Sequence, residues 1–60
     1  MNYILFWKKN NRVSPQYFST EEIGTDAGDK LWHSLSKAEQ DELDELCLLG
    51  ADGEILKRWK

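Results

Sequence analysis

The apolar residues at the start of the chain form a continuous run over residues 3–7, and two lysines follow. Aromatic and β-branched residues favour extended structure, so the run predicts a strand over residues 3–9. The asparagine pair that comes next tolerates positive φ and is typical of a two-residue hairpin turn. A returning strand is therefore expected over residues 12–18. Pro15 has no N–H to donate, which restricts that strand to a sheet edge or makes it irregular.

Glycine interrupts the pattern in the middle of the chain. Residues 24–29 contain two glycines and two aspartates, which predicts a loop. Apolar residues then recur at helical spacing and predict a short helix over residues 29–35. These apolar residues are Leu31, Trp32 and Leu35.

The clearest local signal is a capping box, in which Ser36 and Glu39 stand at the spacing that satisfies two backbone N–H groups. Gly50 sits where a helix commonly ends in a left-handed residue. A main helix is therefore expected over residues 36–49. About half of its circumference would carry Leu43, Leu46, Cys47 and Leu49.

A tight-turn signal precedes residues 54–60, whose alternation predicts a closing strand. The fold class expected from these elements is α+β, in a single domain spanning residues 1–60. A small antiparallel sheet would combine the N-terminal hairpin with the C-terminal strand. The main helix at about 36–49 and the short helix at about 29–35 would pack against it.

Length and composition limit how such a domain can be stabilised. A sixty-residue chain buries only about 60% of the surface that its unfolded form exposes. The single cysteine, Cys47, excludes an internal disulfide, and one cysteine with one histidine falls short of the roughly four ligands of a structural zinc site. The core must come from aromatic side chains or from a second copy. A homodimer would cover the hairpin, which carries apolar residues on both of its faces.

Two features bear on location. The longest apolar run, residues 3–7, is far shorter than the roughly 20 residues that a membrane span needs. The sequence also lacks a signal-peptide pattern, and its lone thiol favours a cytoplasmic location.

The sequence offers no set of catalytic residues. His33 is the single histidine and follows Trp32 without a partner nucleophile. Cys47 sits between two leucines, and the nearest charges in sequence, Asp44 and Glu45, oppose thiolate formation. No glycine-rich phosphate loop and no calcium-binding loop can be assembled. We therefore expect a protein that is not an enzyme and that holds no metal or cofactor.

Acidic residues are concentrated in one part of the chain. Residues 39–54 hold seven acidic side chains and no basic one, whereas the expected strands are basic. On the expected main helix, several acids would surround an exposed leucine. Such a face would bind a basic partner through charge steering and an apolar anchor. The residues expected to make this contact are Asp41, Glu42, Asp44, Glu45 and Leu48.

A short chain with a dense acidic surface and no catalytic set is similar in type to phage-encoded inhibitors of host enzymes, although no motif carries this similarity. The first functional hypothesis is therefore a protein-binding inhibitor or adaptor. Its acidic helix face would dock on a basic site of a nucleic-acid-handling protein.

The alternative hypothesis is a small domain that binds single-stranded nucleic acid. If the first and last strands pair, a basic edge would carry aromatic stacking platforms. The residues expected to form it are Trp7, Lys9, Lys57, Arg58 and Trp59. The formal net charge of −3 argues against direct nucleic-acid binding, because affinity depends on neutralising phosphates.

Overall fold

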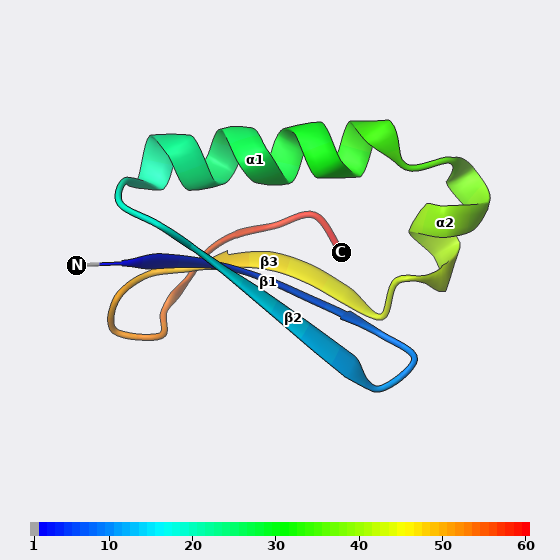
Figure 1. The fold of residues 1–60 in the computed structure, drawn as a ribbon, viewed down its shortest axis with the longest axis horizontal. Helices are drawn as coiled ribbons and strands as arrows, with labels where there is room; N and C mark the ends of the chain where they lie inside the picture. The colour runs from blue at the N-terminus through cyan, green and yellow to red at the C-terminus, as the bar shows by residue number, and fades with distance from the viewer. Residues whose placement is uncertain (1) are drawn as a thin grey trace.

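The computed structural model describes residues 2–60 and shows a four-stranded antiparallel sheet with one long helix across it (Figure 1). The elements are β1 (Tyr3–Lys9), β2 (Arg12–Phe18), α1 (Glu21–Ser34), α2 (Lys37–Glu42), β3 (Glu45–Leu49) and β4 (Ile55–Arg58). The strand order is β2-β1-β3-β4. α1 lies over one face of the sheet, and α2 follows at one end of α1. The expected α+β class is confirmed.

The N-terminal hairpin forms as the asparagine pair predicts. Asn10 and Asn11 have φ angles of 51° and 64°, the left-handed conformation that a type I′ turn requires at both central residues. The turn fixes the register, in which Lys9 pairs with Arg12. β2 is an edge strand, so Pro15 occupies a position where a missing N–H is tolerated.

The main helix expected over residues 36–49 is wrong in its second half. The capping box forms, since Ser36 Oγ lies 3.2 Å from the Glu39 backbone nitrogen and Glu39 Oε1 lies 3.0 Å from that of Ser36. α2 nevertheless ends at Glu42, and Leu43 turns to extended dihedrals. The apolar run that follows becomes β3, which pairs with β1 on one side and β4 on the other. A short continuous apolar run carries no period, so it fits a helix stripe and a buried strand equally well.

The loop expected over residues 24–29 is wrong, and the short helix expected over residues 29–35 is confirmed as far as Ser34 but is only the last part of a longer helix. One continuous helix, α1, occupies this part of the chain. Thr20 caps it, because its Oγ1 accepts a hydrogen bond from the Ile23 N–H at 3.2 Å. The helix therefore begins one turn before the glycines and passes through both of them.

The two glycines of α1 face the sheet rather than break the helix. Gly24 and Gly28 are buried and stand one helical turn apart. A Cβ at Gly24 would lie 2.8 Å from Leu48 Cδ1, and a Cβ at Gly28 would overlap the Trp59 ring. Glycine at these positions lets the α1 backbone approach the sheet closely.

The core fills the space between α1 and the sheet. Its buried centre consists of Leu5, Leu43, Leu46 and Leu48. Partly buried side chains pack around that centre, namely Tyr3, Trp7, Phe18, Ala27, Leu31, Trp32, Leu35 and Trp59. In the described part of the chain, no helix is both long enough and apolar enough to cross a membrane.

The C-terminal segment closes the core at its edge. The strand expected over residues 54–60 is confirmed only over β4, and the chain then leaves the sheet beneath α1 (Figure 1). Trp59 Nε1–H donates to Asp29 Oδ1 at 2.8 Å. Lys60 Nζ donates to two backbone carbonyls of α2, at 2.6 and 3.0 Å. These bonds tie the last two residues to both helices.

Candidate binding surface

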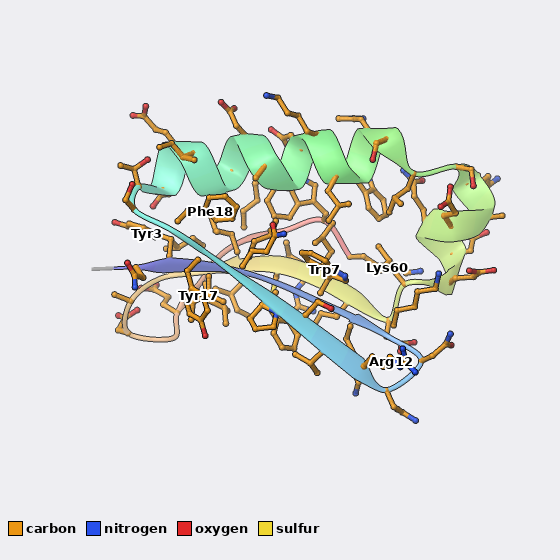
Figure 2. The ribbon with its side chains drawn as sticks, viewed as in Figure 1. Tyr3, Trp7, Arg12, Tyr17, Phe18 and Lys60 are labelled. Atoms are coloured by element: carbon orange, nitrogen blue, oxygen red, sulfur yellow. The ribbon has the colours of Figure 1, made fainter. Side chains whose placement is uncertain are left out.

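The two faces of the sheet differ in what covers them. Alternate side chains of the central strands, Leu5 in β1 and Leu46 and Leu48 in β3, belong to the core under α1. The residues between them point to the other side, where the described residues place no helix. Figure 2 shows this alternation at the end of β2, where Phe18 lies on the α1 side and Tyr17 points away from it. We call the two sides the covered face and the open face.

The register arranges the open face in three rows across the strands. In the order β2, β1, β3 and β4, the rows are Tyr17, Ile4, Leu49 and Ile55, then Pro15, Phe6, Cys47 and Arg58, then Val13, Lys8 and Glu45. The first row is apolar across all four strands. The third row carries a positive and a negative side chain next to each other.

The apolar side chains of the open face are exposed on the two edge strands and half-buried or buried on the two central strands. Tyr17 is 63% exposed and Ile55 is 48% exposed, while Ile4, Phe6 and Leu49 are half-buried. Soluble monomers rarely expose large contiguous apolar patches, and such patches commonly mark interaction sites. The open face therefore has the composition of a docking surface.

Charged side chains on the open face are few and of both signs. Lys8 and Glu45 are cross-strand neighbours, and Arg58 Nη2 lies 3.5 Å from Glu45 Oε1. Cys47 is buried between its neighbours on this face, and this burial, followed by the charge of Glu45, raises the pKa of the thiol above its usual value. The thiol is therefore protonated at neutral pH and packs as a small apolar group.

The residues expected to form one acidic helix face do not come together. Asp41 and Glu42 lie at the end of α2, Asp44 lies between α2 and β3, and Glu45 lies in β3 on the open face. Leu48 cannot be the expected exposed anchor, because it is 0% exposed and packs beneath α1. The reason is that residues 45–49 form a strand and not the end of a helix.

The residues expected to form a basic aromatic edge are divided among three places. Trp7 and Lys9 lie on the covered side near the hairpin turn. Lys57 Nζ lies 3.2 Å from Asp29 Oδ1 and 5.1 Å from the centre of the Trp59 ring, so these side chains fasten the C-terminal segment to α1. Arg58 lies on the open face beside Glu45.

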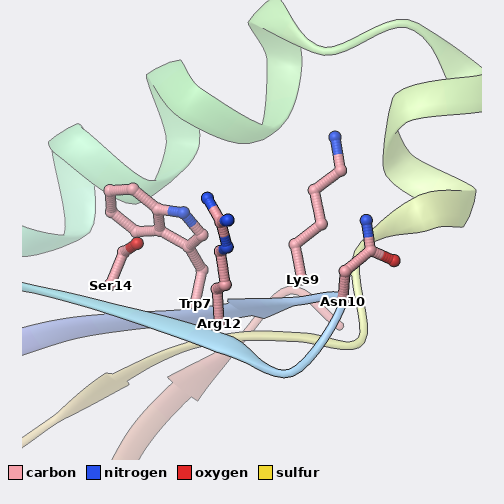
Figure 3. A pocket seen from close by; sticks show the side chains of 5 residues that line it. All are labelled: Trp7, Lys9, Asn10, Arg12 and Ser14. Carbon is pink, nitrogen blue, oxygen red and sulfur yellow. The ribbon is translucent and has the colours of Figure 1, made fainter.

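A pocket does lie on the hairpin, where side chains of β1, β2 and the turn point toward the helices (Figure 3). It measures about 560 Å³ and is lined by Trp7, Lys9, Asn10, Arg12 and Ser14. Lys9 Nζ also forms an ion pair with Glu42 Oε2 at 3.2 Å, which offsets part of its charge. The set predicted from the sequence does not include Ser14. The hairpin register could have found it, since it places Ser14 opposite Trp7.

A smaller apolar pocket of about 180 Å³ adjoins the same tryptophan on its α1 side. Its lining consists of Trp7, Lys9, Leu31, Leu35, Glu39 and Leu43. Across residues 2–60, no three His, Cys, Asp or Glu side chains gather in a way that could hold a metal ion.

Comparison of the chain with models of protein families, with curated proteins and with solved structures gave no match.

Proposed function

We propose that this protein is a small non-enzymatic protein-binding module whose docking surface is the open face of its sheet. The observation that carries the proposal is the apolar row that crosses all four strands without a covering element in the described chain. Burying apolar surface contributes about 25 cal/mol per Å². A partner that binds this row would bury its apolar surface, and the complex would gain free energy that the free domain lacks.

The side chains of the open face are of the kind that anchors protein interfaces. Phe6 and Tyr17 are aromatic, and large aromatic side chains contribute disproportionately to protein–protein binding. Arg58 at the border of the patch can pair with a carboxylate or a carbonyl of a partner. We place this binding in the cytoplasm, where the unpaired Cys47 thiol stays reduced.

The acidic helices have a secondary role in this proposal. α1 and α2 together hold seven acidic and two basic side chains, whereas the four strands hold five basic and one acidic. Charge separated in this way attracts a basic partner at long range, as an inhibitor of a nucleic-acid-handling protein would require, but it draws that partner toward the helical layer and does not orient it on the open face. Affinity would still come from the apolar open face, because no exposed leucine stands among the acids of α2.

Two isoleucines provide a matched test. Ile55 is 48% exposed on the open face, and Ile23 is 51% exposed on α1. A tagged wild-type chain purified from its native cell should capture a protein that Ile55→Lys fails to capture and that Ile23→Lys retains. Once purified, the captured protein should bind the wild-type chain and Ile23→Lys directly, and it should not bind Ile55→Lys. If Ile23→Lys abolishes capture and Ile55→Lys does not, the helical layer is the binding surface and the proposal is wrong.

A second candidate function is single-strand nucleic-acid binding at the hairpin pocket. The observation that favours it is the combination of the Trp7 indole with Lys9 and Arg12 around one cavity. A base could stack on the indole while the two cations meet phosphates. Titration with an oligonucleotide at low salt should quench tryptophan fluorescence, and Arg12→Gln should weaken the quenching. Unchanged fluorescence at low salt eliminates this candidate.

A further inference from the structure

We infer that the partner on the open face is a second copy of this chain, related to the first by a two-fold axis that runs between β1 and β3, parallel to the strands. The inference rests on the proposed function, because it uses the same docking surface. The resulting dimer would be a sandwich of two sheets, with strands crossing at the usual angle of about 30° and with the helices outside.

The strand order allows such an axis to pair every strand of the open face. β1 and β3 are the two central strands. A two-fold axis between them lays β1 of one copy over β3 of the other, and β2 over β4. The rotation keeps each row over the same row. A β1 residue therefore meets the β3 residue of its row in the other copy, and a β2 residue meets the β4 residue of its row.

The charged row is self-complementary under this rotation. Lys8 and Glu45 are register partners across β1 and β3. The axis therefore places Lys8 of each copy over Glu45 of the other, and the contact occurs twice by symmetry. This reciprocity is what an isologous interface requires. Opposite charges that meet in pairs also disfavour other registers.

The apolar side chains of the other two rows match in size, although the axis also places Arg58 of each copy over Pro15 of the other. The middle row sets the large Phe6 of one copy against the small Cys47 of the other. The first row sets Ile4 against Leu49, and Tyr17 against Ile55, at the corners of the patch. Large side chains opposite small ones allow two sheets to interdigitate.

The other in-plane axis, perpendicular to the strands, gives a worse match. It would exchange the first and third rows, so Lys8 of one copy would lie over Ile4 of the other. A charged side chain held against an apolar one loses solvation without gaining a partner. Charge therefore selects the axis that runs along the strands.

The distribution of charge over the whole molecule agrees with self-association through this face. The acidic side chains of α1 and α2 lie on the far side of the sheet from the open face. Two copies joined by their open faces keep these like charges apart, in two outer layers, so repulsion opposes association less than it would through any helical surface. Among the described residues of the three rows, only Lys8, Glu45 and Arg58 are charged, so the face does not select a strongly charged macromolecule.

The size of the face limits the strength of the dimer. Strands about 4.8 Å apart and rows about 7 Å apart give a footprint on the order of 400 Å². Stable complexes commonly bury about 800 Å² on each partner, so this interface belongs to the weak class. We expect association in the micromolar range.

The first experiment is sedimentation equilibrium of the full chain from about 1 µM to about 1 mM, which spans the range of weak interfaces. The wild-type protein and Ile23→Lys should pass from monomer to dimer, and Ile55→Lys should remain monomeric. A wild-type protein that stays monomeric over the whole range overturns the inference. A dimer that survives Ile55→Lys also overturns it.

A charge exchange tests the axis itself. Lys8→Glu alone would set two carboxylates against each other in both contacts, and Glu45→Lys alone would set two ammonium groups together, so each variant should dimerise roughly tenfold more weakly or worse. Mixed in equal amounts, the two variants should associate again, because the proposed axis joins a carboxylate to an ammonium group in each contact. The perpendicular axis would set residue 8 of one copy against Ile4 of the other and would bring no such pair together. A folding defect in either variant could not produce recovery on mixing, because each chain keeps its substitution, and any folding defect that this causes, in the mixture. Failure to recover contradicts the proposed axis.

The proposed function and this inference can fail separately. If the wild-type chain is monomeric but Ile55→Lys loses a different captured protein, the docking surface stands and the second copy is wrong. If the chain neither self-associates nor captures a protein through the open face, both are wrong.

Discussion

The covered and open faces belong to the same four strands and differ in a single physical respect, the presence of α1. In β3, Leu46 and Leu48 are fully buried beneath that helix, while Leu49 on the opposite side remains partly exposed. Antiparallel sheets commonly have one face packed and one face in contact with water. Here the face away from the helix is also apolar over most of its area. Burial of the covered face accounts for folding, but it does not account for the apolar side chains of the open face.

The covered face is closed by tight contacts. Two glycines bring the α1 backbone onto Leu48 and Trp59, and Asp29 accepts hydrogen bonds from Trp59 and Lys57. Among the described residues, the polar contacts of the open face are the Arg58–Glu45 ion pair and a long Cys47 Sγ–Glu45 Oε1 contact of 3.9 Å, both toward its charged end. Substitutions should therefore reduce the free energy of unfolding on the covered face, and should alter association on the open face.

The largest effect is expected from Leu48→Ala. Removing a buried leucine side chain costs about 2–5 kcal/mol, against a total stability of about 3–9 kcal/mol for sixty residues. Leu49→Ala, on the open face of the same strand, should cost about 1 kcal/mol because that side chain is only half-buried. Urea unfolding at concentrations below dimer formation measures both values. Equal losses would mean that the two faces contribute equally to folding.

Gly28→Ala should rank second. The added methyl group meets the rigid Trp59 ring and should reduce the free energy of unfolding by about 1–3 kcal/mol. Gly24→Ala is the matched control, since its methyl group meets the flexible end of Leu48, which can shift. Both changes gain about 1 kcal/mol of helix propensity, so this contribution cancels in the comparison. Greater damage at Gly24 would contradict the close approach of Trp59 to α1.

The sequence predicted the hairpin well because its turn leaves little freedom. Asn10 and Asn11 accept the left-handed conformation, and once they form the turn, the register of β1 and β2 follows. The α+β class and the cap at Ser36 were predictable for the same reason, since both rest on local signals.

The sequence could not reveal the first half of α1 or the strand β3, because each depends on contacts between distant residues. Gly24 and Gly28 look like helix breakers until Leu48 and Trp59 are known to lie against them. The run at residues 46–49 has no period of its own, and only pairing with β1 makes it a strand. The open face could not be predicted for the same reason, because its rows appear only when β3 is placed between β1 and β4.

A third and smaller effect concerns pH. Hydrogen bonds from Trp59 Nε1–H and Lys57 Nζ hold the pKa of Asp29 below its ordinary value of 3.8. A carboxylate with a lowered folded-state pKa stabilises the fold above its unfolded pKa, and this contribution is lost as the pH falls through the folded-state value. Asp29→Asn keeps an oxygen that accepts from Trp59 but removes the titration.

Urea midpoints measured from neutral pH down to about pH 2 test this linkage. Asp29→Asn should lose less stability than the wild type below about pH 4. The decline should persist in part, because hydrogen bonds from the Ser36 N–H and hydroxyl also lower the pKa of Glu39. An Asp29→Asn profile that follows the wild type at every pH would contradict a titrating contact between Asp29 and the C-terminal segment.

The smallest effect on stability is expected from Ile55→Lys and Ile23→Lys. Both side chains are about half exposed, so each change should alter the free energy of unfolding of the monomer by no more than about 0.5 kcal/mol. The two variants should nevertheless differ in association, since only Ile55 lies in the apolar row of the open face. Unfolding curves at low and high protein concentration separate these properties. The wild type and Ile23→Lys should gain stability with concentration, because a dimer stabilises the folded state by mass action. Ile55→Lys should gain no stability with concentration. A gain equal to that of Ile23→Lys would mean that Ile55 takes no part in association.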